Sequence, residues 1–162
     1  MRRTDFDMKQ LILLRHGEAG FSDGVDFQRQ LTLRGKESLH RLGLLLQTRG
    51  LSVDRMYCSS ATRTRETAEI IKSYIPIKEE IYDKEIYSAS LELLINLLEN
   101  TPSEVQTCLM VGHNPTISLL MAHLSDGQYR GLSPGMMGVL ELEIADWYHI
   151  GINTGTLKEI LH

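Results

Sequence analysis

Apolar and polar positions along the chain form alternating strand-like and helix-like segments. Residues 10–15 (QLILLR) are a short, continuous apolar run, which is typical of a strand buried on both faces. In residues 31–50 the leucines recur at helical spacing. A second pair follows, since residues 54–60 read as a strand and residues 61–75 as a helix that ends before a proline. The first half of the chain therefore predicts two β-α pairs.

The second half continues this alternation, with one ambiguous segment. Residues 77–87 (IKEEIYDKEIY) are compatible with a strand or a loop, and residues 91–100 predict a helix. Residues 107–115 are an apolar run closing on a turn, and residues 116–124 predict a helix directly after it. The chain ends in two segments that alternate like strands at the rim of a sheet, residues 137–144 and 155–161. This order predicts an α/β sandwich with a mostly parallel sheet and one antiparallel strand.

Length and charge narrow the class of protein further. At 162 residues and 42% hydrophobic content, the chain is expected to form one domain over residues 1–162, with residues 1–9 as a flexible N-terminal extension. A net charge of −4 provides no basic field for nucleic acid or an anionic membrane. The sequence has no apolar signal core and no run long enough to cross a bilayer, so a cytoplasmic location is expected. Cys58 and Cys108 lie in separate apolar segments and are expected to be buried thiols.

Three polar loops are predicted to meet at one edge of the sheet. His16 follows the first strand, residues 59–63 follow the second, and residues 112–115 follow the fourth. In parallel α/β sheets, ligands bind beyond the carboxyl ends of the strands. This edge would collect two guanidinium groups and two imidazoles, from Arg15, His16, Arg63 and His113. A cationic pocket in an acidic protein favours a small anion, and planar donor forks suit a phosphoryl group best.

The motifs in these loops resemble those of a known family. LRHGEA (14–19), SSATRTRETA (59–68) and VGHNP (111–115) occur in the order and with the separations of the histidine phosphatase superfamily, and the short chain resembles its phosphohistidine phosphatase group. Two further segments resemble weaker family features, residues 26–35 and 85–90. The resemblance implies a three-layer α/β/α sandwich of the phosphoglycerate mutase-like type, and activity without a metal or other cofactor.

The resemblance also implies roles for individual residues. His16 would be the nucleophile that takes the phosphoryl group, and Arg15, Arg63 and His113 would complete the phosphate pocket. A histidine with a pKa of about 6.5 is largely neutral at pH 7, so one ring nitrogen can attack phosphorus if an acceptor holds the other N–H. We expect the backbone carbonyl of Gly17 to be that acceptor. His113 would contribute its full charge only when protonated.

The proton donor for the leaving group is the open point of this assignment. Several superfamily members supply it from a carboxylate between the second and third helices, which favours Glu85, with Asp83 and Glu18 as alternatives. The phosphohistidine group lacks a clear counterpart. A phosphoimidazole leaves more readily than an alkoxide, so a missing acid would favour phosphohistidine over phosphoesters.

Four residues near the motifs are candidates for substrate contacts, namely Gly17, Glu18, Arg29 and Asn114. Arg29 could close over the substrate or brace a loop. Glu18 could orient pocket groups or lie on the loop surface. Asn114 could touch the phosphate, although Asn-Pro also makes a turn at a helix start.

A cysteine shortly before an arginine suggests a competing assignment. Cys58 precedes Arg63 with four intervening residues, where the phosphate loop of cysteine-dependent phosphatases has five, and the glycines of that loop are absent. We therefore expect Cys58 to be a core residue. Ser59 and Ser60 could be nucleophiles in principle, but they are expected to cap the following helix.

The sequence thus predicts a metal-independent phosphatase that acts on a phosphorylated protein carrying phosphohistidine or on a small phosphorylated metabolite. The alternatives are a phosphoglycerate mutase-type phosphotransferase and a non-catalytic module that binds phosphoproteins. No nucleic acid or membrane partner is expected, and the oligomeric state is not inferable. Specificity is expected to lie in residues 20–30, around Glu85 and in residues 125–135.

Overall fold

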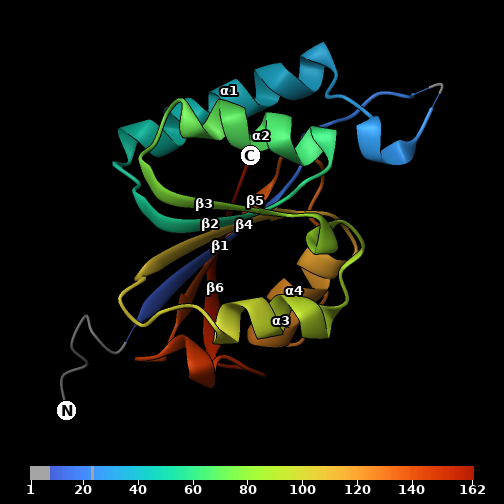
Figure 1. Cartoon of the computed structure of the whole chain (residues 1–162). Helices are drawn as coiled ribbons and strands as arrows, with labels where there is room; N and C mark the ends of the chain where they lie inside the picture. Colours follow the sequence, from blue (N-terminus) through green and yellow to red (C-terminus); the bar gives the residue numbers. More distant parts are fainter. Residues whose placement is uncertain (1–7, 23) are drawn as a thin grey trace.

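The computed structural model describes residues 8–22 and 24–162 as one six-stranded sheet with helices on both faces (Figure 1). The strands are β1 (Lys9–Arg15), β2 (Val53–Ser59), β3 (Ile77–Asp83), β4 (Thr107–Gly112), β5 (Met137–Leu142) and β6 (Gly155–Leu161). The helices are α1 (Leu33–Thr48), α2 (Thr62–Lys72), α3 (Leu91–Glu99) and α4 (Thr116–Leu124). Three short 3-10 turns complete the described elements, η2 (Asp26–Gln28), η3 (Lys84–Ser88) and η4 (Trp147–His149).

The sheet has the strand order β3-β2-β4-β1-β5-β6. Strands β1 to β4 pair in parallel, and β5 is antiparallel to both of its neighbours, β1 and β6. Strand β6 therefore runs in the same direction as β1. This confirms the predicted mostly parallel sheet with one antiparallel strand.

The helices form two outer layers, which makes the expected α/β/α sandwich. In Figure 1, α1 and α2 cover one face of the sheet, and α3 and α4 cover the other. Strand β1 packs against both helix layers. Ile12 and Leu14 lie in the core on the α1 and α2 side. Leu11 and Leu13 lie in the core on the α3 and α4 side. This burial on both faces explains why residues 10–15 are continuously apolar.

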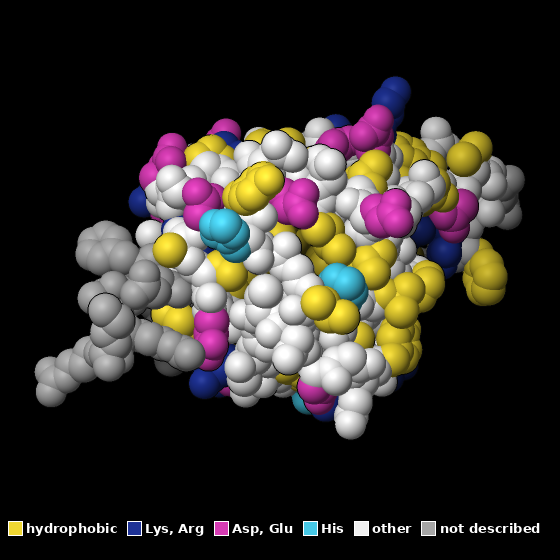
Figure 2. Space-filling model, turned by 90° about the horizontal axis from the view of Figure 1, so that it is seen from below, with side chains coloured by type: hydrophobic (Ala, Val, Ile, Leu, Met, Phe, Trp, Pro, Cys, Tyr) yellow, Lys and Arg dark blue, Asp and Glu magenta, His cyan; other side chains and the backbone are white. Residues whose placement is uncertain are grey.

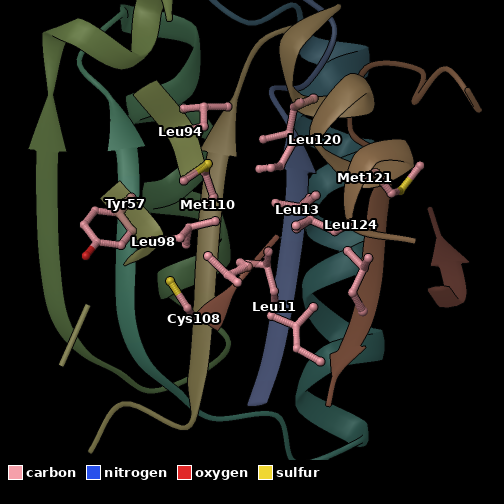
Figure 3. Packing of buried hydrophobic residues seen from close by; sticks show 14 of the residues in the cluster. Leu11, Leu13, Tyr57, Leu94, Leu98, Cys108, Met110, Leu120, Met121 and Leu124 are labelled. Carbon is pink, nitrogen blue, oxygen red and sulfur yellow. The ribbon is translucent and has the colours of Figure 1, made fainter. Parts of the chain in front are cut away.

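The core on the α3 and α4 side is packed with leucine side chains and with the sulfur-containing side chains of Met and Cys. Figure 3 shows Leu94 and Leu98 of α3 and Leu120 of α4 around Met110 in the central strand β4. Cys108 lies in the same cluster, fully buried, and both cysteines are free thiols, as expected.

Helix boundaries follow the expected capping chemistry, with one difference. The Thr32 side chain accepts a hydrogen bond from the Gly35 N–H at the start of α1, and Gly50 ends that helix with a φ of 69°. Helix α2 ends at Lys72, three residues before the predicted end. The residues leading into Pro76 leave the helix because proline disfavours helical backbone in the residue before it.

Two segments with uncertain predictions have defined positions in the structure. Residues 77–87 divide between β3 and η3. Strand β1 begins at Lys9, inside the segment predicted as an extension, and Lys9 is buried. Residues 1–7 of that predicted extension lie outside the described residues.

The lower face of the molecule mixes apolar and acidic side chains. In Figure 2, Asp and Glu are scattered between apolar groups, and the Lys and Arg that can be seen lie toward the margins. Within the described ranges, every helix is too short or too polar to cross a membrane.

Candidate active site

The predicted convergence of three loops is present at the carboxyl edge of the sheet. Arg15 at the end of β1 is paired in register with Gly112 at the end of β4, and β2 ends beside β4 at Ser59. The neighbouring strands are parallel, so the chain leaves them at one edge. His16, the first turn of α2 with Arg63, and His113 therefore meet there.

The His16 ring is held from both sides. Its Nδ1 lies 2.7 Å from the Gly17 carbonyl oxygen. Its Nε2 accepts a hydrogen bond from Arg63 Nε at 3.3 Å. A carbonyl can only accept, so Nδ1 carries the proton and Nε2 carries the lone pair. The expected role of the Gly17 carbonyl is thus matched by the geometry.

The surroundings of His16 keep the ring neutral. The side chain is 8% exposed. Burial, together with the positive charges of Arg63 and Arg15, lowers the pKa of His16 to about 4. The ring at pH 7 is therefore an uncharged imidazole whose unprotonated nitrogen is Nε2.

His113 faces His16 across the site. The two ring centroids are 5.3 Å apart, and His113 Nε2 lies 2.8 Å from Ser59 Oγ. His113 Nδ1 is buried without a hydrogen-bond partner among the described residues. Burial, His16 and Arg63 lower the pKa of His113 to about 3. The protonated form expected from the sequence is thus disfavoured at pH 7 unless an anion comes beside the ring.

A hydrogen-bonded ring fixes Arg15. The Leu132 carbonyl accepts from Arg15 NH1 at 2.9 Å and from Asn114 Nδ2 at 2.8 Å. The Ser118 hydroxyl donates to Asn114 Oδ1 at 2.7 Å and accepts from the Leu132 N–H at 2.9 Å. Ser118 is fully buried. Both ends of the Asn114 amide thus bond within the protein, and the residue positions the loop that holds Arg15.

Arg63 is held by Asp26, which was not among the predicted site residues. NH1 donates to the Asp26 carbonyl at 2.9 Å, and NH2 donates to Asp26 Oδ2 at 3.1 Å. The Tyr87 hydroxyl donates to the same Oδ2, and its ring packs edge-on against His113 with centroids 5.3 Å apart. Hydrogen bonds from Tyr87 and Arg29 hold the pKa of Asp26 well below its usual range.

Only a weak signal could have drawn attention to these two residues. Asp26 and Tyr87 lie in residues 26–35 and 85–90, the segments with the weaker family features. Neither segment has a spacing that places its side chains at the site.

The other predicted site residues lie around this centre. Arg29 donates to the Gly20 and Ala19 carbonyls at 2.8 and 3.3 Å and to Asp26 Oδ1 at 3.0 Å, so it braces the loop. The exposed Glu18 accepts from the Thr32 hydroxyl at 2.9 Å.

Gly17 and Glu85 differ in how closely they approach the centre. Gly17 is buried, and its N–H donates to Thr67 Oγ1 at 3.0 Å. Glu85 is exposed, and its backbone N–H donates to Asp83. Across the parts of the chain described, no hydrogen bond or ion pair joins the Glu85 carboxylate to the four pocket residues.

The competing cysteine site is not formed. Cys58 is fully buried, and burial raises the pKa of its thiol far above neutral pH. Ala61, with no side-chain hydrogen bond, is the N-cap of α2, so the expected capping by Ser59 and Ser60 is wrong in this detail. Ser59 instead contacts His113, and it accepts from the Ala61 N–H at 3.3 Å.

An open groove is lined in part by chain neighbours of the site residues. It has a volume of about 640 Å³ and is lined by Phe27, Gln28, Ser60, Thr62, Arg65, Tyr82, Asp83 and Lys84. Thr62 and Phe27 are the chain neighbours of Arg63 and Asp26. Among residues 8–22 and 24–162, no three His, Cys, Asp or Glu side chains are placed to hold a metal ion.

The sequence is similar to several proteins over part or most of its length. The sequence model for the histidine phosphatase superfamily (branch 1) matches residues 11–94. An uncharacterized protein of Mycobacterium leprae is 31% identical over 117 residues, which cover 69% of this chain and 71% of that protein. An uncharacterized protein of Mycobacterium tuberculosis is 32% identical over 108 residues, which span 66% of each, just under two thirds of that relative. The mitochondrial serine/threonine-protein phosphatase PGAM5 of Xenopus tropicalis is 34% identical over 68 residues, 42% of this chain and 24% of that protein.

Solved structures share the fold over nearly the whole chain. A putative phosphohistidine phosphatase SixA from Nakamurella multipartitia superposes with a TM-score of 0.82 at 26% identity and covers 96% of both chains. The protein histidine phosphatase SixA complexed with tungstate superposes with a TM-score of 0.81 at 20% identity, over 94% of this chain and 96% of that one. The second likeness is one of fold alone.

Proposed function

The chain belongs to the histidine phosphatase superfamily, and from that membership we propose that it is a phosphatase that forms a covalent phosphohistidine at His16. Its substrate class is phosphohistidine in a protein or a small phosphomonoester. The observation that carries the proposal is the orientation of His16, whose neutral Nε2 lone pair faces Arg63 while Nδ1–H is held by Gly17.

The first step is attack on phosphorus by His16. The Nε2 lone pair forms the new P–N bond, and the bond from phosphorus to the leaving atom breaks with its electron pair going to that atom. Phosphorylated His16 carries a positive ring charge, because Nδ1 keeps its proton. The Gly17 carbonyl, 2.7 Å from Nδ1, stabilises that charge through a stronger hydrogen bond.

The cationic side chains around His16 would bind the phosphoryl oxygens. Charge spreads over the three equatorial oxygens as the leaving bond loosens, and preformed donors aimed at that charge lower the barrier. Arg63 Nε already points at the His16 nitrogen that would carry phosphorus. Arg15 Nε is buried without a partner among the described residues, so it has a donor free for an oxygen in the same pocket. An anion beside His113 would raise the pKa of that ring and recruit its charge as well.

Water completes the cycle. Its oxygen attacks phosphorus, the P–Nε2 bond breaks with the electron pair returning to His16, and a proton of the water passes to solvent. An alkoxide leaving group needs a proton in the first step, and we propose Glu85 for that role in phosphomonoester hydrolysis. A leaving imidazole makes a smaller demand on an acid.

The test combines a variant with a chemical trap. His16→Ala should lower kcat/KM for a phosphoramidate or p-nitrophenyl phosphate on the order of 10³-fold or more. The wild-type protein, quenched during turnover of labelled phosphoramidate, should carry an acid-labile, alkali-stable label that His16→Ala lacks. His149→Ala is the matched control, because His149 is exposed in η4. Undiminished activity of His16→Ala would refute the proposal, and tight phosphopeptide binding without turnover would favour a binding module.

A further inference from the structure

Five side chains form a closed ring of contacts around the proposed phosphoryl position. Arg63 Nε reaches His16 at 3.3 Å, and Arg63 NH2 reaches Asp26 at 3.1 Å. The Tyr87 hydroxyl bonds to Asp26, and the Tyr87 ring packs on His113. His113 faces His16 at 5.3 Å, which closes the ring.

The side chains of this ring differ in their exposure to solvent. His16 is 8% exposed and Arg63 is 6% exposed. The Asp26 side chain is 50% exposed and belongs to η2, the short turn that Figure 1 shows in blue beyond the end of the sheet. Asp26 is thus a solvent-facing carboxylate one side chain away from buried His16, because Arg63 contacts both.

Asp26 has acceptor capacity left for a further hydrogen bond. An ionised carboxylate offers about four lone-pair positions. Oδ1 accepts from Arg29 NH1 at 3.0 Å, and Oδ2 accepts from Arg63 and Tyr87. One position on Oδ1 therefore remains, on a side chain half open to solvent.

We propose that Asp26 is a specificity-determining residue, whose carboxylate accepts a hydrogen bond from the protonated ring of a leaving imidazole and so favours phosphohistidine over phosphate monoesters. This inference rests on the proposed function and concerns the same site. The Phe27 ring, which packs edge-on against Tyr87 with centroids 5.0 Å apart, adds an aromatic surface beside the carboxylate.

The bond changes explain the selectivity. In a ring-protonated phosphohistidine the nitrogen not bonded to phosphorus carries a proton, and the ring bears a positive charge. When His16 attacks, the P–N bond breaks, its electron pair goes to the ring nitrogen, and a neutral imidazole departs with the proton it already had. Asp26 stabilises the cationic form that can leave in this way. An alkoxide would need a proton that the ionised carboxylate does not have, and an anionic leaving group would be repelled.

The experiment measures a ratio of substrates. Phosphohistidine and p-nitrophenyl phosphate are hydrolysed by the wild type and by Asp26→Asn, which keeps the size of the side chain and removes its charge. Loss of a hydrogen bond to a charged group should lower kcat/KM for phosphohistidine by about 10- to 100-fold more than for p-nitrophenyl phosphate. Asp26→Glu keeps the charge and should retain most of the wild-type ratio.

A matched control exists within the sheet. Glu79 in β3 is 51% exposed and is also paired with an arginine, Arg55, at 2.8 Å. Glu79→Gln should leave both activities unchanged.

The outcomes separate this inference from the proposed function. Equal losses on both substrates in Asp26→Asn would mean that Asp26 only positions Arg63, and would overturn the inference. Unchanged activity of Asp26→Asn on both substrates would overturn it as well. If His16→Ala kept full activity, the proposed function itself would fail, whatever the Asp26 variants did.

Discussion

The neutral state of His16 leads to a prediction that can be measured without a substrate. An exposed histidine titrates near pH 6.5, whereas burial and two nearby arginines lower the pKa of His16 to about 4. At pH 5.5, His16 should be about 97% neutral, compared with about 9% for an ordinary histidine. The perturbation is a decrease in pH from 8 to 4.5, at the end of which about three quarters of the His16 rings should still be neutral.

The same difference in pKa is linked to stability. Between pH 6.5 and about pH 4 the unfolded chain binds a proton at His16 and the folded protein does not. The free energy of unfolding should therefore fall over this interval by up to roughly 3 kcal/mol from His16, with no loss at pH 7 and no further loss below pH 4. His16→Asn removes this contribution, so the variant should lose less stability than the wild type between pH 7 and pH 4.5.

Nuclear magnetic resonance provides the direct assay. The Cε1–H signals of the six histidines are followed through the titration, and His16 is assigned by the signal that His16→Asn lacks. Denaturant unfolding of both proteins at pH 7 and pH 4.5 tests the linkage. A His16 midpoint at or above pH 6 would refute the reasoning, because burial and the arginines would then not set its protonation state.

Two further predictions concern the support of the site. Ser118→Ala removes the hydroxyl that holds Asn114, leaves buried partners unsatisfied, and should lower kcat/KM roughly tenfold. Thr101→Val, at a buried threonine whose hydroxyl donates to the Leu97 carbonyl, is the control, and equal effects of the two variants would contradict a specific role. Gly35→Ala would place a Cβ 2.4 Å from the backbone oxygen of Glu18, and the forced shift should lower the free energy of unfolding by about 1–3 kcal/mol. An unchanged melting temperature would argue against that clash.

The sequence predicted the elements well where a local signal exists. Residues 10–15 show burial on both faces by their continuous apolar character, and Thr32 and Gly50 mark helix ends by their own side-chain or backbone chemistry. Residues 77–87 remained ambiguous, because β3 has mostly exposed or half-buried positions and shows little apolar alternation. Its place is decided by pairing with β2, which is a contact between segments.

The same distinction between local signals and contacts between segments applies to the pocket. The order of the strands and their parallel direction were sufficient to bring His16, Arg63 and His113 to one edge, since each directly follows a strand or starts the helix after it. The contacts of Asp26 and Tyr87 depend on the paths of two loops, and these residues are 61 positions apart.

The sequence by itself determined the fold class and selected the residues of the proposed reactive centre, because strand and helix periodicity and the three motifs are local properties of the chain. The tertiary structure alone decided what surrounds that centre. It placed Asp26 on Arg63, tied Arg15 to Leu132 and left Glu85 exposed on the surface. The physical reason is that a side-chain contact between loops is set by the packing of the elements that carry them, which no pattern of neighbouring residues specifies.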